Sequence, residues 1–153
     1  KIELTRLFVG NINGCIGETS AILLLLALVW LLYQKVIFIP LLVGPLLGLF
    51  TAKLILHLLG LDTLPLWQGY LINVFGGGTL FASIFMATEP ITAPINNTAR
   101  WLYAILIGFL AAIISSLSAF NAGFMFAILL GNTFGPLIEI AVTNWEKSRK
   151  AAA

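Results

Sequence analysis

The residues best suited to chemistry lie in two short segments, each beside a long apolar run. In the first, residues 14–20, a glycine-rich stretch leads into Gly17, Glu18, Thr19 and Ser20. If a helix begins there, its free backbone N–H groups and the two hydroxyls could bind a phosphate or another polar group. The same residues are also ordinary helix-capping residues, and Glu18 is favourably placed by the helix dipole. Ligand binding and simple capping are both consistent with this segment.

The second segment places Thr88, Glu89 and Thr92 at the end of an apolar run, among prolines. Their carboxylate and hydroxyl oxygens could bind a cation or the hydroxyl groups of a ligand. Ionisable groups at membrane depth are candidates for function. A carboxylate that borders a loop can equally be a simple interfacial residue, so both interpretations stay open.

Four other polar side chains stand inside apolar runs. Lys53 and His57 are four residues apart and so share one helix face. Because a lysine at mid-membrane costs about 2.5 to 3.5 kcal/mol on insertion scales, we expect Lys53 to reach the interface or find a carboxylate, and the former is preferred. His57 could ligate a haem or a chlorophyll only as a single axial ligand. Asn132 and Glu139 are seven apart, and we expect Asn132 to form an interhelical hydrogen bond.

Composition then identifies the solvent in which these groups must lie. Of the 153 residues, 60% are hydrophobic and only 9% are charged, whereas soluble domains carry about 25% charged residues. The net charge of +2 comes largely from the last residues, which excludes a nucleic-acid surface. The single cysteine, Cys15, and the single histidine exclude an internal disulfide and a Cys/His metal or cluster site within one chain.

Hydropathy predicts an all-α, polytopic membrane protein with about five transmembrane helices. A span needs about 20 apolar residues, and the chain has five apolar runs taken as spans, at residues 21–33, 36–59, 71–88, 100–118 and 124–142. The glycines at 76–78, 131 and 135 are expected to allow close helix packing. Three regions follow: a glycine-rich extracytoplasmic segment at 1–17, a five-helix transmembrane domain at 18–143, and a basic cytoplasmic tail at 144–153.

The orientation follows from the distribution of basic residues. An odd number of spans puts the two ends of the chain on opposite sides of the membrane. One side then carries five basic residues, Lys35, Arg100, Lys147, Arg149 and Lys150, and the other carries Lys1, Arg6 and the snorkelling Lys53. By the positive-inside rule, the carboxyl end is predicted to be cytoplasmic in a cell inner membrane.

Three segments carry a more specific resemblance. They are Gly-Asn-Ile-Asn-Gly-Cys-Ile-Gly-Glu-Thr-Ser at 10–20, Phe-Met-Ala-Thr-Glu-Pro-Ile-Thr-Ala-Pro at 85–94, and Phe-Ala-Ile-Leu-Leu-Gly-Asn-Thr-Phe-Gly-Pro-Leu-Ile-Glu at 126–139. In this order and spacing the chain resembles the NqrB/RnfD family. That family forms the large membrane subunit of the sodium-pumping NADH:quinone oxidoreductase and of the Rnf complex. The resemblance implies one half, the carboxyl-terminal one, of an inverted-repeat fold of about ten helices.

The resemblance also implies a flavin, either FMN or riboflavin. The family attaches FMN to a threonine in a Ser-Gly-Ala-Thr type motif, which we expect in a preceding part of the subunit. Met86-Ala87-Thr88 shares only the last two residues of that motif, so no attachment residue is assigned here. The candidate cofactor-binding residues are Gly17, Glu18, Thr19, Ser20, Thr88, Glu89 and Thr92. No catalytic residue and no metal ligand is assigned.

The preferred hypothesis is a subunit, or fragment, of an Rnf- or Nqr-type complex that supports flavin-mediated transmembrane electron transfer coupled to Na⁺ or H⁺ transport. We expect other membrane subunits, the lipid bilayer and a quinone as partners, and two separate sites on opposite faces of the membrane. One alternative is a non-catalytic accessory subunit derived from this family. Another is half of a small transporter or channel.

Overall fold

All regular structure in the described part of the chain is helical. The computed structural model describes residues 20–61, 65–76, 78–89, 91–117 and 123–151. The helices are α2 (Ala21–Tyr33), α3 (Ile39–Leu58), α4 (Leu66–Gly76), α5 (Thr79–Phe81), the π-helix η1 (Ala82–Met86), α6 (Asn97–Leu117) and α7 (Gly123–Ala151). The predicted all-α class is confirmed.

Three of the described helices, α3, α6 and α7, are long and apolar enough to cross a membrane. The third predicted span, by contrast, is broken: α4 and the α5–η1 segment meet at 61° and count as a fourth span only if taken together. Gly78, with φ 68°, stands at this break, in a conformation that side chains with a Cβ rarely adopt. The first predicted span, α2, has 13 residues, about 20 Å, which is less than the roughly 30 Å hydrocarbon core.

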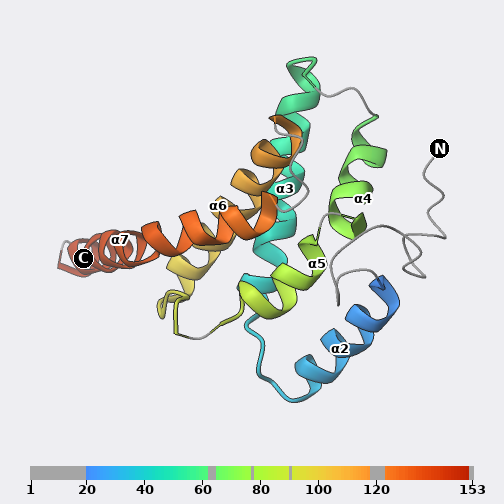
Figure 1. The fold of residues 1–153 in the computed structure, drawn as a ribbon. Helices are drawn as coiled ribbons and strands as arrows, with labels where there is room; N and C mark the ends of the chain where they lie inside the picture. Colours follow the sequence, from blue (N-terminus) through green and yellow to red (C-terminus); the bar gives the residue numbers. More distant parts are fainter. Residues whose placement is uncertain (1–19, 62–64, 77, 90, 118–122, 152–153) are drawn as a thin grey trace.

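The centre of the molecule is the pair α3 and α6, which run in the same direction (Figure 1). Glycines let the two backbones approach closely. A Cβ added at Gly48 would lie 2.1 Å from the Ile105 carbonyl oxygen, and one added at Gly108 would lie 1.9 Å from the Pro45 carbonyl oxygen. Small residues give this kind of contact in membrane helix pairs, where dispersion replaces the hydrophobic effect.

Two apolar clusters extend from this pair. One joins α6 to α7 and η1 around Tyr103, Ile107 and Phe124. The other joins α2, α3 and α4 around Leu24, Leu49 and Val74. The end of the α2–α3 connection also contacts α6. The Arg100 guanidinium of α6 lies 3.7 Å from the centroid of the Phe38 ring.

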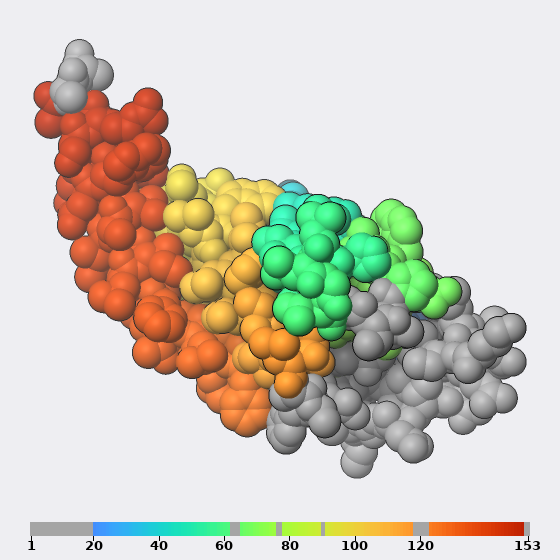
Figure 2. Space-filling view, turned by 90° about the horizontal axis from the view of Figure 1, so that it is seen from above, coloured from blue at the N-terminus to red at the C-terminus, as the bar shows by residue number. Residues whose placement is uncertain are grey.

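Helix α7 is longer than the fifth predicted span. It runs for 29 residues and continues without a break through the residues expected to form a separate tail. Its carboxyl end projects from the rest of the molecule (Figure 2, red). The polar residues after Val142 therefore belong to the same helix as the apolar ones before it.

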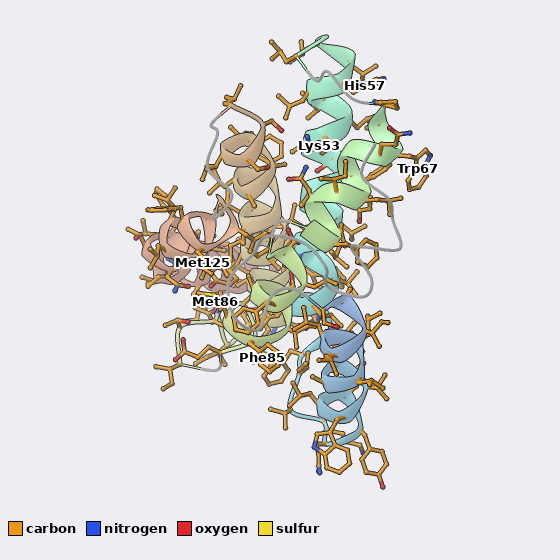
Figure 3. All side chains as sticks on the ribbon, turned by 45° about the vertical axis from the view of Figure 1, so that its right-hand side comes forward. Lys53, His57, Trp67, Phe85, Met86 and Met125 are labelled. Carbon is orange, nitrogen blue, oxygen red and sulfur yellow. The ribbon has the colours of Figure 1, made fainter. Side chains whose placement is uncertain are left out.

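The prediction that Lys53 reaches the interface is wrong. The residue is only 4% exposed, although His57, one turn later on α3, is exposed; both lie on the upper part of α3 (Figure 3). Lys53 belongs to the stripe of α3 that also buries Leu49, Ala52 and Leu56. Spacing of this kind turns one face of a helix toward its neighbours, so the lysine is carried into the interior with them.

Candidate functional site

The densest set of described polar contacts lies where the chain enters α6. We call it the α6–α7 junction: residues 88–98, apart from residue 90, together with Glu139 and Glu146 of α7. The Glu139 carboxylate accepts hydrogen bonds from the backbone N–H groups of Ile95 and Asn96, both at 3.1 Å. The Glu146 carboxylate accepts from the Asn96 side-chain amide at 2.9 Å and from the Thr98 hydroxyl at 3.2 Å.

The local sequence explains this arrangement. Asn96 is a capping residue, because its side-chain oxygen accepts from the Thr98 N–H at 2.8 Å. The start of α6 also carries free N–H groups and the positive end of the helix dipole, which favour nearby carboxylates. Glu139 and Glu146 are seven residues apart, two helical turns, so both point from one face of α7 toward the start of α6.

Three of the residues predicted from the sequence, Thr88, Glu89 and Thr92, lie in the same junction, and they make different kinds of contact. The Thr88 hydroxyl donates to the Ile84 carbonyl of η1 at 2.5 Å. The Thr92 hydroxyl donates to the Glu89 carboxylate at 3.2 Å, and both of these side chains are exposed. The Thr88 hydroxyl is therefore used in a hydrogen bond to the backbone. Glu89 and Thr92 form a small polar group on the outer surface of the junction.

Two further contacts hold the junction in place. The Arg100 side chain donates from Nε to the Pro94 carbonyl at 2.8 Å. One turn further along α6, the fully buried Tyr103 donates from its hydroxyl to the Asn132 side-chain oxygen of α7. The interhelical hydrogen bond predicted for Asn132 is therefore confirmed.

The other predicted segment falls mostly outside the described residues, which begin at Ser20. This is the case for Gly17, Glu18 and Thr19. Ser20 is the N-cap of α2 with extended backbone, φ −99° and ψ 103°, and its carbonyl accepts from the Leu24 N–H at 3.2 Å. Its side chain makes no capping hydrogen bond. The predicted helix start is thus in place, and a second site at this segment stays a prediction.

Sequence reasoning missed the part played by Glu146 and by Asn96. Glu146 falls in the segment predicted as a tail, and Asn96 precedes the predicted span at 100–118. The available signals were the asparagine before a helical run, and the seven-residue spacing that puts a second carboxylate on the face of Glu139. Neither signal names the helix that the carboxylates contact, because that depends on how α7 crosses α6.

Nearly the whole chain matches a known protein family. Residues 1–146 match the family model described as the NQR2, RnfD, RnfE family. The chain belongs to this family. Its resemblance to NqrB and RnfD is thereby confirmed, and its apolar helices are those of a multi-pass membrane protein.

Individual members of the NQR2, RnfD, RnfE family show the same relation. The chain is 35% identical over 150 residues to the NqrB subunit of the Na(+)-translocating NADH-quinone reductase of Ectopseudomonas mendocina. It is 35% identical over 147 residues to that of Pseudoalteromonas atlantica, and 30% identical over 150 residues to that of Haemophilus influenzae. Each match covers 95% of this chain and 36% of the relative. The chain thus spans about a third of the length of these curated relatives.

The described junction offers an open surface and not an enclosed cradle for a flavin. Glu89 and Thr92 are exposed, and the Thr88 hydroxyl is already bound to backbone. Glu89, Glu139 and Glu146 put negative charge around this surface, which disfavours a phosphate. Their oxygens suit hydroxyl groups better, so these residues could contact one polar edge of a flavin. Among the described residues no set of carboxylates is grouped to hold a metal ion.

Proposed function

We propose that this chain is the carboxyl-terminal half of a membrane subunit of an Nqr- or Rnf-type complex. In this role it supports flavin-mediated transmembrane electron transfer coupled to Na⁺ or H⁺ transport. The observation that carries the proposal is the α6–α7 junction in a member of this family. Irregular backbone and ionisable groups beside membrane spans are tolerated mainly where they line a polar site.

The residues of the junction divide between holding and contact. Glu139 and Glu146 of α7 hold the start of α6 in place. Their carboxylates accept hydrogen bonds from four groups of residues 95–98. That leaves the bonded pair of Glu89 and Thr92 facing outward. There they would accept or donate hydrogen bonds to the ribityl hydroxyls of a flavin, or meet a cation. A bound flavin would supply the electron-transfer chemistry, and this chain would orient its polar edge.

The proposal includes partners and an orientation. Relatives are described as subunits of a reductase, so we infer other membrane subunits and a quinone as partners. We also place the carboxyl end in the cytoplasm. Support comes from the positive-inside rule, because five basic residues, Lys35, Arg100, Lys147, Arg149 and Lys150, fall on one side of the membrane in the predicted topology.

Two other functions have some support. A non-catalytic accessory subunit is favoured because every carboxylate of the junction already has a hydrogen-bond partner within it. Half of a transporter is favoured by the broken α4 and α5–η1 segment, because discontinuous helices commonly line transport sites.

The test compares Glu89→Gln with Glu139→Gln in the full-length subunit within its complex. Glutamine keeps the shape and removes the charge. Glu89 has no helix end to hold, so Glu89→Gln should assemble normally but lose most turnover or flavin. Glu139→Gln is the structural control and should lower thermal stability, because a charged acceptor of two backbone N–H groups is lost. Wild-type turnover, flavin content and ion coupling in Glu89→Gln would leave the accessory subunit as the better function.

A further inference from the structure

The end of α7 extends beyond the length that a membrane requires. A helix of 29 residues is about 43 Å long, roughly 13 Å more than the hydrocarbon core. The side chains that α7 buries against the molecule run from Gly123 to Val142. After Val142 the helix continues to Ala151 as the projecting end in Figure 2.

This projecting end combines an aromatic ring with three cationic side chains. Trp145 is 55% exposed, and the Arg149 guanidinium lies 5.1 Å from its ring centroid. Lys147 and Lys150 are exposed on the same two turns. Tryptophan prefers the boundary between hydrocarbon and headgroups. Stacking on the ring also holds the arginine in a fixed position while leaving its N–H groups available.

The nearby carboxylates are directed elsewhere. Glu146 lies on the same turn, but its oxygens accept hydrogen bonds from Asn96 and Thr98. Glu139 is bound to the backbone at the start of α6. Glu89 accepts a hydrogen bond from the Thr92 hydroxyl, and both residues lie between η1 and α6. The projecting end therefore presents a positive surface. The carboxylates of the junction are instead hydrogen-bonded to residues 92–98.

We propose that Trp145, Lys147, Arg149 and Lys150 form a docking surface for the anionic phospholipid headgroups of the bilayer. Charge complementarity selects a negatively charged occupant, because basic segments just outside a span are attracted to anionic lipid. The exposed Trp145 selects the headgroup region, since tryptophan prefers the boundary between hydrocarbon and headgroups. An arginine fork also matches the geometry of a phosphate. The inference requires only the membrane placement and is independent of the proposed electron transfer.

The test measures lipid binding to the purified full-length protein in neutral detergent. Native mass spectrometry would count bound phosphatidylglycerol and phosphatidylcholine as each lipid is titrated. The wild type should bind phosphatidylglycerol preferentially. The triple variant Lys147→Gln/Arg149→Gln/Lys150→Gln should bind it about a hundredfold more weakly, at about fivefold per basic residue near an anionic surface. Its phosphatidylcholine binding should be unchanged.

Three controls make the result decisive. Lys1→Gln/Arg6→Gln removes positive charge near the amino end and should keep the preference for phosphatidylglycerol. Arg149→Gln alone, at an exposed site, should weaken binding about fivefold with an unchanged melting temperature, so that misfolding is separated from lost binding. Inorganic phosphate at millimolar concentration should not displace the lipid. Equal phosphatidylglycerol binding in the triple variant and the wild type, an equal loss in the amino-terminal variant, or displacement by free phosphate would overturn the proposal.

Discussion

Single polar atoms decide how α6 and α7 fit together. The buried Tyr103 donates its hydroxyl proton to Asn132, and the Tyr103 ring packs beside Gly131 and Gly135. In an apolar surrounding, a polar side chain that loses its partner leaves the other group unsatisfied. This hydrogen bond therefore fixes the rotation of α7 about its own axis, and with it the direction in which Glu139 points.

Replacing Tyr103 with phenylalanine tests this role. Tyr103→Phe keeps the ring and removes the donor, and we expect a loss of about 0.6 to 2 kcal/mol in thermal unfolding in detergent. The matched control is Tyr70→Phe, because the Tyr70 hydroxyl is 3.4 Å from the Leu46 carbonyl and makes at most a weak bond. Equal losses in the two variants would show that the Tyr103 bond carries no special weight.

At the scale of the elements, backbone approach sets the α3 and α6 crossing. The Gly48 and Gly108 positions have no room for a methyl group, because backbone oxygens occupy the space. The position of Gly135 is different: its added Cβ would meet the Thr92 carbonyl oxygen at 3.6 Å, an ordinary contact. Glycines that read alike in the sequence therefore carry very different structural demands.

The corresponding prediction compares two alanine substitutions. Gly108→Ala forces the helices apart, since the clash is with Pro45 backbone and not with a flexible side chain. We expect a loss of about 3 kcal/mol or more, or failure to assemble. Gly135→Ala should retain yield and stability. Size-exclusion profiles and thermal unfolding in detergent measure both, and normal behaviour of Gly108→Ala would contradict the close crossing.

At the scale of the whole molecule, contacts distant in sequence bring the start of α6 and the late turns of α7 to one end. The Thr98 hydroxyl donates to Glu146, and the Arg100 guanidinium lies on the ring of Phe38, the N-cap of α3. The start of α6 thus contacts both the start of α3 and the late turns of α7. The orientation that the positive-inside rule predicts stays a prediction.

Cysteine labelling tests the orientation. With Cys15 replaced by alanine, Ser148→Cys places a single thiol at an exposed position on α7. A membrane-impermeant maleimide should fail to label it in intact cells and should label it in inverted vesicles. The matched reporter is Thr5→Cys, near the amino end, which should show the opposite pattern. Labelling of Ser148→Cys from outside intact cells would reverse the proposed topology.

The sequence by itself determined the solvent, the helical class and the family. The apolar composition indicates a lipid environment. In lipid, runs of about 20 apolar residues can form all their backbone hydrogen bonds only as helices or closed barrels. The apolar runs at 36–59 and 100–118 accordingly appear as α3 and α6 within a few residues. The interhelical role of Asn132 could also be predicted, because a lone amide in an apolar run must find a partner.

The tertiary structure alone decided which polar groups meet. Four features depend on how helices cross: the interior position of Lys53, the break in the third span, the continuation of α7, and the contact of Glu146 with Asn96 and Thr98 at the start of α6. Sequence spacing fixes which side chains share a helix face, but not which neighbour that face contacts. In α7 the same carboxylate spacing would serve an exposed tail equally well. Only the approach of α6 makes Glu139 and Glu146 part of a junction.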